Sequence, residues 1–248
     1  MEENVFELLQ GYKSADGVVH KEYVLREMDG SDEEAISKKE IKANGAKVLR
    51  TLLTRCCTRI GNICKDDVKP AEWTAIIQSL VAFDQDMMLL NLRRISLGEE
   101  IETEYDCPNP DCKEKISYTM GIDELEVIPY DGLEEIPFEL PKGAKDKEGN
   151  LLRKGTIRRP NGLDREILDS VIRSNVGRAN TLMLARCITN LEGKPVHDDL
   201  IRSLSVKDRN YLLDLLDQHK FGINMQVEIE CPTCYETFKA SLNAVNFI

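Results

Sequence analysis

Two pairs of cysteines in this sequence have the spacing of metal-binding knuckles. One is C-P-N-P-D-C, beginning at Cys107, and the other is C-P-T-C, beginning at Cys231. In a knuckle the chain turns tightly so that both sulfurs reach one ion, and a proline after the first cysteine helps to fix that turn. Four thiolates complete the tetrahedral shell of a structural zinc ion and leave no open position for water or substrate. The sequence therefore predicts a structural, non-catalytic Zn²⁺ site with the ligands Cys107, Cys112, Cys231 and Cys234.

Two other interpretations of the same cysteines are a redox dithiol and four free thiols. A redox C-x-x-C is expected at the start of a helix that follows a strand, whereas each pair here is expected between two strands. Metal binding is therefore favoured. Because each knuckle supplies only two ligands, neither can close a site alone. A shared ion would require two tandem halves of one chain or a second subunit, and the sequence leaves open whether the four cysteines share one ion within a chain.

The remaining cysteines and the histidines are not expected to do chemistry. Four cysteines are expected in apolar helices without a nearby histidine, and buried packing is their expected role: Cys56, Cys57, Cys64 and Cys187. The three histidines are placed in a turn, an acidic loop and the last turn of a helix: His20, His197 and His219. No glycine-rich segment is followed by the G-K-[ST] of a phosphate loop. The sequence therefore predicts a protein that is not an enzyme.

Composition limits the kinds of partner. The chain has 248 residues, a net charge of −11 and a pI near 4.9. Affinity for nucleic acid comes largely from Lys and Arg, so this balance opposes nucleic-acid binding, and acidic residues directly precede the first knuckle. The single basic cluster, from Arg153 to Arg159, is interpreted as charge that protects a strand edge. We expect no membrane span, no signal peptide and a cytoplasmic protein that binds other proteins.

The sequence contains an internal repeat. With an offset of 132, residues 6–34 match residues 138–166 at ten positions, among them turn glycines and cap residues. With an offset of 124, eight later positions agree, including Asp84 with Asp208 and the first cysteines of the knuckles. We therefore predict two tandem homologous units, residues 1–128 and 129–248, joined through an acidic connector over Asp123–Glu135.

Each unit is expected to contain the same elements in the same order. A glycine-bearing turn and a short strand come first, followed by a helix for which Ser31 and Glu34 form a predicted capping box. Core helices follow at Val48–Cys57 and Thr181–Ile188. Each unit then ends in alternating strands on either side of its knuckle. The predicted fold is α+β, with two units of helices, short antiparallel zinc-ribbon-like hairpins and a pseudo-two-fold relation between the units.

In order, these motifs resemble a known family, the phage baseplate proteins of the T-even type, which are hub assembly components of contractile tails. The resemblance is clearest in the second unit. It runs through F-E-L-P-K-G from Phe138, the strand at Arg158, the helix with Asp164 and Glu166, D-R-N-Y-L-L from Asp208, and the closing C-x-x-C. The first unit is a diverged version with a knuckle two residues longer, and the duplication is a departure from the family pattern.

The resemblance implies a non-enzymatic role in the virion or in its assembly. The protein would join the central hub of a tail baseplate, near the spike, tube initiator and tape measure, as part of a larger assembly. It would be found in the virion tail, and in the host cytoplasm during assembly. Because the duplication departs from the family, three roles stay open: a hub component, an assembly factor or tail chaperone that is not retained in the virion, and a zinc-ribbon regulatory adaptor.

Overall fold

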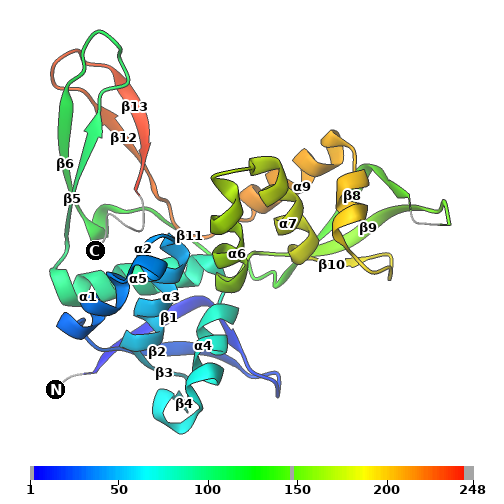
Figure 1. The fold of residues 1–248 in the computed structure, drawn as a ribbon, viewed down its shortest axis with the longest axis horizontal. Helices are drawn as coiled ribbons and strands as arrows, with labels where there is room; N and C mark the ends of the chain where they lie inside the picture. Colours follow the sequence, from blue (N-terminus) through cyan, green and yellow to red (C-terminus); the bar gives the residue numbers. More distant parts are fainter. Residues whose placement is uncertain (1–2, 146–147, 243–248) are drawn as a thin grey trace.

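A computed structural model describes residues 3–145 and 148–242. The chain forms two lobes, each with helices packed on a small sheet, and two β-hairpins that project together from the first lobe (Figure 1). The elements of the first lobe are β1 (Asn4–Lys13), β2 (Val19–Leu25), α1 (Gly30–Ile36), α2 (Lys39–Lys42), α3 (Gly45–Cys56), β3 (Cys57–Ile60), β4 (Ile63–Cys64), η1 (Lys65–Asp67), α4 (Pro70–Ser79) and α5 (Ala82–Leu97). Its antiparallel sheet has the order β1-β2-β3-β4.

The second lobe has the same order of main elements. They are β8 (Glu135–Lys145), β9 (Leu151–Arg158), α6 (Gly162–Ile172), α7 (Val176–Cys187), β10 (Ile188–Leu191), α8 (Asp198–Ser203) and α9 (Val206–Gln218). Its sheet has the order β10-β9-β8. Helices α3 and α7 begin at Gly45 and Val176, three and five residues before the predicted core helices, because Asn44 and Asn175 cap them.

One predicted cap is wrong. The N-cap of α1 is Asp29, whose carboxylate accepts hydrogen bonds from the backbone N–H groups of Ser31 and Asp32, and the capping box is completed by Asp32. Ser31 and Glu34 therefore lie inside the helix. The corresponding helix α6 is capped in the same way by Asn161 and Asp164, and Ser205 caps α9. Helices α1 and α6 therefore begin in the same way, with an Asp or Asn at the N-cap and an Asp three residues later that completes the capping box.

The hairpins and the segments beneath them follow each lobe in sequence. The first hairpin is β5 (Glu100–Asp106) with β6 (Lys115–Gly121), and the second is β12 (Gln226–Glu230) with β13 (Thr237–Ser241). The connector forms η2 (Ile122–Glu124) and β7 (Val127–Ile128), and β7 pairs with β11 (Gly222–Ile223). The acidic connector therefore contributes a strand, β7, which pairs with the strand that begins at Gly222.

Both hairpins belong to one hydrophobic core. That core contains the helices of the first lobe together with Ile101, Ile116, Val227, Ile229 and Leu242. The second lobe has a separate core, built from β8, β9 and helices α7 to α9. The C-terminal hairpin is therefore buried with the first lobe, although the chain reaches it through the second (Figure 1).

The predicted pseudo-two-fold relation does not hold for the two lobes. At their junction Val81 forms an antiparallel bridge with Asn161. A two-fold relation, applied with the repeat offsets, would also pair Ser205 with Asp29. The isolated bridges among the described residues are Val81 with Asn161 and Leu191 with Lys194, so this counterpart is missing there. The lobes are therefore packed through different surfaces.

Polar contacts hold the lobe junction. The backbone N–H of Ala82 donates to the carbonyl of Pro160 at 2.9 Å, and that of Gly162 donates to the carbonyl of Leu80 at 3.1 Å. Arg165 of α6 donates two hydrogen bonds of 2.7 Å to the two carboxylate oxygens of Asp86 on α5. Bidentate pairs of this kind fix geometry as well as adding energy. The relative placement of the lobes is thus specified by directional bonds.

The basic cluster of the sequence does not protect a strand edge. The Arg159 side chain is buried, lies over the rings of Tyr130 and Phe221, and donates to the carboxylate of Asp131 at 2.7 Å. Arg158 donates to Asp164 at 2.6 Å. Both arginines therefore neutralise or cover internal groups, because a buried guanidinium needs a partner for its charge.

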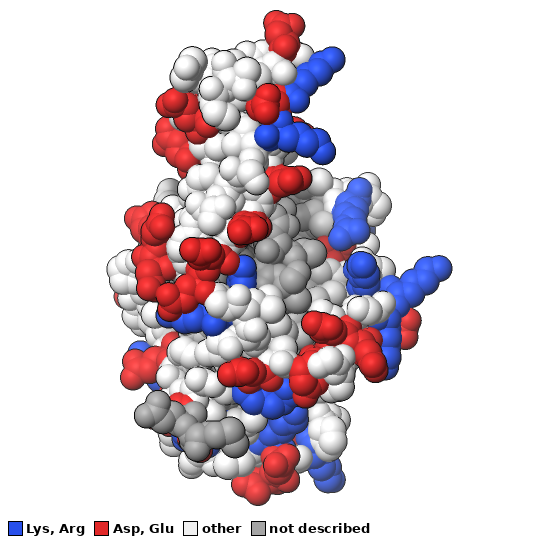
Figure 2. Space-filling view, turned by 90° about the vertical axis from the view of Figure 1, so that its left-hand side faces the viewer, with Lys and Arg blue, Asp and Glu red and all other residues white. Residues whose placement is uncertain are grey.

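The acidic residues are concentrated on the first hairpin. Residues 99–126 include ten acidic and two basic residues, and the outward side chains of β5 are exposed: Glu100, Glu102, Glu104 and Asp106. Figure 2 faces this side of the molecule and shows acidic side chains on the projecting hairpin as well as on the body below it. Among the described residues, no helix has the length and apolar character needed to span a membrane.

A glycine-to-alanine pair tests the lobe junction. A Cβ atom on Gly162 would lie 2.0 Å from the side-chain nitrogen of Gln85, whereas a Cβ on Gly30, the matching first residue of α1, would meet nothing within 4 Å. Gln85 is buried and bonded to the carbonyl of Ile77, so it has little room to move. We expect Gly162→Ala to lower the free energy of unfolding by about 1–3 kcal/mol in urea denaturation. Gly30→Ala should change it by less than about 1 kcal/mol, and equal effects would contradict this junction.

A second prediction concerns acid stability. Burial disfavours the charge of Asp131, but hydrogen bonds from His219 and Arg159 hold its pKa at about 2. Since the pKa is near 4 in the unfolded chain, the charged carboxylate stabilises the fold above about pH 4, and this contribution is lost as the pH falls toward about 2. The difference in unfolding free energy between wild type and Asp131→Asn should therefore shrink over this range. A difference that is constant with pH would contradict it.

Candidate metal centre

The two knuckles are the turns of the two hairpins. Strand β5 leads into Cys107 and β6 begins shortly after Cys112, while β12 leads into Cys231 and β13 follows Cys234. In both hairpins alternate side chains point inward, including Ile101 and Ile116 in the first and Val227 and Ile229 in the second. Burial of these residues in one core places the hairpins against each other, and their turns then meet.

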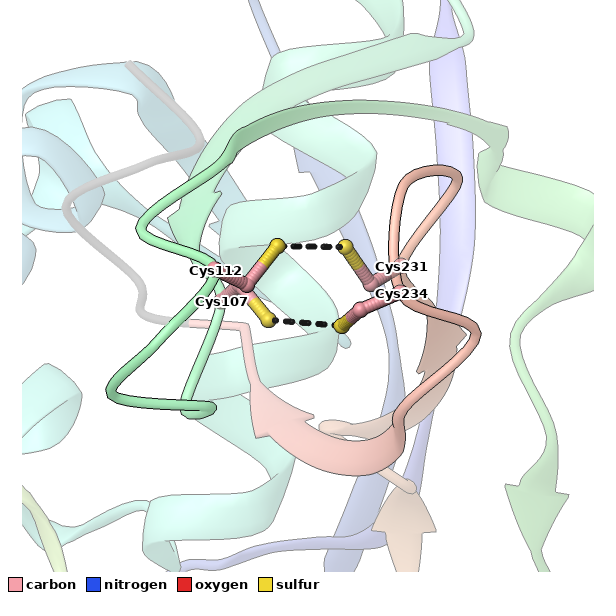
Figure 3. A group of neighbouring side chains, drawn as sticks. All are labelled: Cys107, Cys112, Cys231 and Cys234. Carbon is pink, nitrogen blue, oxygen red and sulfur yellow. Dashed lines mark hydrogen bonds between the residues drawn. The ribbon is translucent and has the colours of Figure 1, made fainter.

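The four sulfur atoms converge on one point. They all lie within 4.8 Å of one another, although the knuckles are far apart in the sequence. The Sγ atoms of Cys107 and Cys234 are 3.6 Å apart, and those of Cys112 and Cys231 are 3.7 Å apart. Figure 3 shows the side chains of each knuckle pointing toward the other. Zn–S bonds of 2.3 Å in a tetrahedron require sulfur–sulfur distances of about 3.8 Å, so these positions fit such an ion.

The two knuckles share their backbone geometry. The N–H of Cys107 donates to the carbonyl of Glu114 at 2.8 Å, and the N–H of Cys231 donates to that of Glu236 at 2.9 Å. The residue after the second cysteine has a left-handed φ in both, +54° at Lys113 and +60° at Tyr235. This conformation is uncommon outside glycine. Two turns of different length therefore end in the same backbone conformation.

The environments of the thiols differ. Burial raises the pKa of the Cys107 thiol to about 12. Backbone N–H groups at Cys234 and Thr233 instead lower the pKa of Cys231 to about 7. A metal must displace the protons of its cysteine ligands, and the Cys231 thiol loses its proton more readily than that of Cys107. The cluster could hold a metal ion with four sulfur ligands, a shell that leaves no coordination position for a substrate.

Comparison with protein families shows which family the chain belongs to. Residues 18–192 match the family described as T4 bacteriophage base plate protein. The match covers more than two thirds of the chain. The chain belongs to this baseplate family. Comparison with curated proteins and with solved structures gave no match.

Family membership confirms the coarser part of the expected identity, a structural protein of a phage tail that assembles with other tail proteins. The matched residues include Cys107 and Cys112 and extend through both predicted units as far as β10. The second knuckle lies beyond the matched residues. The metal site of this baseplate protein therefore rests on its own geometry.

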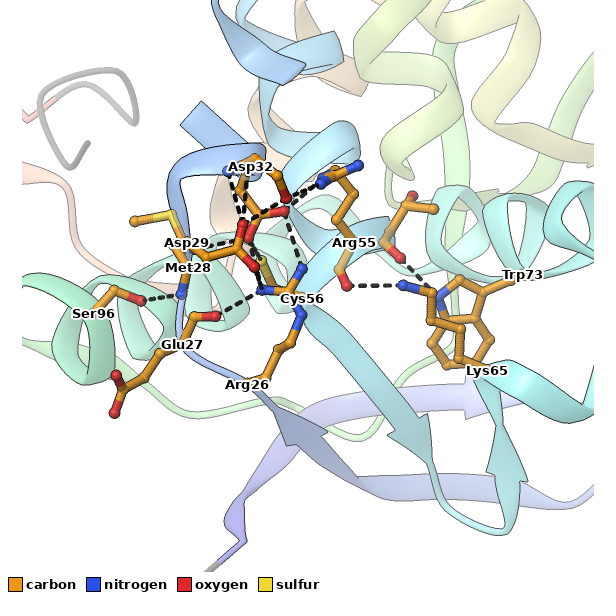
Figure 4. A network of polar contacts seen from close by, with 12 residues as sticks. Arg26, Glu27, Met28, Asp29, Asp32, Arg55, Cys56, Lys65, Trp73 and Ser96 are labelled. Atoms are coloured by element: carbon orange, nitrogen blue, oxygen red, sulfur yellow. Dashed lines mark hydrogen bonds and ion pairs between the residues drawn. The ribbon is translucent and has the colours of Figure 1, made fainter. Parts of the chain in front are cut away.

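The other cysteines of the baseplate protein are in packed surroundings. Burial raises the pKa values of Cys56, Cys57 and Cys187 to about 12, which disfavours the thiolate that a nucleophile needs. Figure 4 shows Cys56 beside the buried carboxylate of Asp32, which accepts hydrogen bonds from Arg26 at 2.7 Å and from Arg55 at 2.5 Å. Cys57 and Cys64 lie in strands, so the prediction that they belong to helices is wrong.

The structure also shows functional positions that sequence reasoning missed. Buried Asp84 accepts backbone hydrogen bonds from Leu9 at 2.8 Å and Gly11 at 2.9 Å, and Asp208 accepts one from Lys142 at 2.7 Å. These carboxylates fasten helices α5 and α9 to the bulged strands β1 and β8. The two aspartates match each other at the repeat offset of 124 residues. This match was a signal that they make equivalent contacts. Of the histidines, His20 is buried in β2 and is not in a turn.

Cobalt binding tests the metal centre. Co²⁺ added to the reduced, metal-free protein should produce the intense visible absorption of a tetrahedral thiolate site, because four sulfurs surround one position. Cys112→Ser should weaken and shift this absorption. Cys64→Ser, a half-buried cysteine outside the cluster, should leave it unchanged. An absorption that is insensitive to Cys112→Ser would show that the metal binds elsewhere.

Proposed function

We propose that this protein is a non-enzymatic structural or assembly component of the central hub region of a contractile tail baseplate, with its two hairpins joined by a structural zinc ion. The ligands are Cys107, Cys112, Cys231 and Cys234. The convergence of four sulfurs from two hairpins within 4.8 Å carries the proposal, together with family membership. Under this proposal the ion fixes the hairpins as one rigid projection, and the surfaces of the two lobes and the projection bind neighbouring proteins.

Repeated contacts support a duplicated origin for the two units. In the first lobe two partly exposed arginines, Arg26 and Arg55, pair with the buried carboxylate of Asp32. Arg158 and Arg186 pair with buried Asp164 in the same way in the second lobe. Gly11 and Gly143 have φ values of +96° and +86°, and a Cβ on either would lie within 3 Å of a backbone carbonyl oxygen. We therefore retain units 1–128 and 129–248 as sequence repeats. The second hairpin then belongs to one unit by origin and to the other lobe by packing.

Charge supports protein partners over nucleic acid. The projection carries most of the acidic excess of the chain, and phosphates would be repelled by it. Partners in the hub, spike, tube initiator or tape measure would have to meet this surface with basic or neutral groups. A tail chaperone that leaves before the particle matures, present only in the host cytoplasm, is the second candidate. It differs from a hub component in one observable, the absence of the protein from purified particles. A zinc-ribbon regulatory adaptor would show salt-dependent retention on DNA.

The proposal is tested by comparing assembly with and without the zinc ion that joins the two hairpins, which we call the metal clasp. We expect one zinc ion per chain by metal analysis, whereas half an ion per chain would indicate ligands pooled between chains. Zinc contributes about 10–16 kcal/mol to the folding of small zinc peptides, so chelation should loosen the hairpins and lower the melting temperature. The Cys112→Ser/Cys231→Ser double variant should keep its helical circular dichroism but lose co-purification with co-expressed tail-tip proteins.

Cys64→Ser is the matched control, since it removes a thiol outside the cluster. It should assemble as wild type. Co-purification that survives both chelation and the double variant would refute a role for the metal in assembly. Equal melting temperatures with and without chelator would refute the clasp itself.

A further inference from the structure

The sulfur contacts in the cluster cross between the hairpins. Cys107 contacts Cys234 at 3.6 Å, and Cys112 contacts Cys231 at 3.7 Å. Both pairs join the first cysteine of one knuckle to the second cysteine of the other, within a cluster whose four sulfurs lie within 4.8 Å of one another. Each contact therefore links one hairpin turn to the other, and the two contacts lie side by side. Figure 3 shows both contacts bridging the gap between the two turns.

We propose that the cluster is also a disulfide site, in which removal of the metal under oxidising conditions joins Cys107 to Cys234 and Cys112 to Cys231. This inference rests on the proposed metal clasp. In each step a low-molecular-weight disulfide is the oxidant. A cysteine thiolate attacks it, one small thiol leaves, and the facing cysteine then displaces the second small thiol from the mixed disulfide. Two protein thiols are oxidised, and one small disulfide is reduced to two thiols.

The predicted pairing differs from the usual outcome for a C-x-x-C pair. Closure within a knuckle would link residues three or five positions apart and would leave the hairpins unconnected. Closure across the gap links residues 127 and 119 positions apart, and cross-links that close long loops remove more freedom from the unfolded chain. The hairpins would therefore stay joined after the metal has gone.

This chemistry matches the two surroundings of a tail protein. In a reducing cytoplasm thiols persist and hold metal, whereas disulfides persist on virion surfaces outside the cell. The same four sulfurs would join the hairpins in both surroundings. Among the described residues, the cluster contains no further cysteine, and Cys56, Cys57 and Cys187 are buried elsewhere.

The experiment is disulfide mapping of the full-length protein. Chelator-treated protein is exposed to oxidised glutathione, digested without reduction and analysed by mass spectrometry. We expect peptides that join Cys107 to Cys234 and Cys112 to Cys231, faster migration of the intact chain on a non-reducing gel, and a melting temperature that no longer responds to chelator. Zinc-loaded protein should resist oxidation. Peptides joining Cys107 to Cys112 and Cys231 to Cys234, or cross-linked dimers, would overturn the inference.

Paired variants separate geometry from reactivity. Cys112→Ser/Cys231→Ser leaves only the facing pair Cys107 and Cys234 in the cluster, while Cys231→Ser/Cys234→Ser leaves only the first knuckle. The facing pair should form its disulfide on the order of tenfold faster, because its sulfurs are already in contact. Equal rates would overturn the inference. Zinc binding by wild type together with pairing within the knuckles would reject this inference while leaving the proposed function intact.

Discussion

The packing of two short hairpins against each other is the constraint on which the rest of the structure depends. A two-stranded hairpin is marginal on its own, because it has one face to bury and little to bury it against. Here each hairpin covers the apolar face of the other, and both continue into the core of the first lobe. Neither has a complete set of metal ligands. The cluster of sulfurs is therefore a property of the pair, and it exists only when the chain has brought its C-terminal hairpin back to the first lobe.

The relation between the two hairpins differs from the relation between the two lobes. With the repeat offset, the contact of Cys107 with Cys234 is the counterpart of the contact of Cys231 with Cys112, and both are present. The backbone bonds of Cys107 and Cys231 are counterparts as well. The hairpins thus obey a local two-fold relation that the lobes do not. The lobe junction, with Val81 against Asn161 and Asp86 against Arg165, is specific to the present chain order, so the two units have different surroundings and different roles in the fold.

Much of the site and part of the fold could be predicted from sequence for physical reasons. Ligand spacing and turn prolines are local, so the knuckles and their hairpins were identifiable. The neighbours of a buried residue are not local. Arg158 and Asp164 were both visible in the repeat, but their pairing depends on the sheet and helix that bring them together. Helix α5 did contain a signal that was missed. Its residues Met88, Leu89, Leu90 and Leu92 are apolar around the whole helix, and all are buried, whereas α9 has Asp214 where α5 has Leu90.

The difference between α5 and α9 explains why the second hairpin lies on the first lobe. Helix α5 contacts both β1 and the segment around β11, where Phe83 packs against Phe221. Helix α9 needs no second cover because its outer side is polar. The chain therefore returns to the first lobe at Phe221. Two sets of contacts then link segments that are far apart in the sequence, the lobe junction and the sulfur cluster. Since each of these contacts holds the groups of the other close together, the polar junction would strengthen the proposed metal binding without touching the metal.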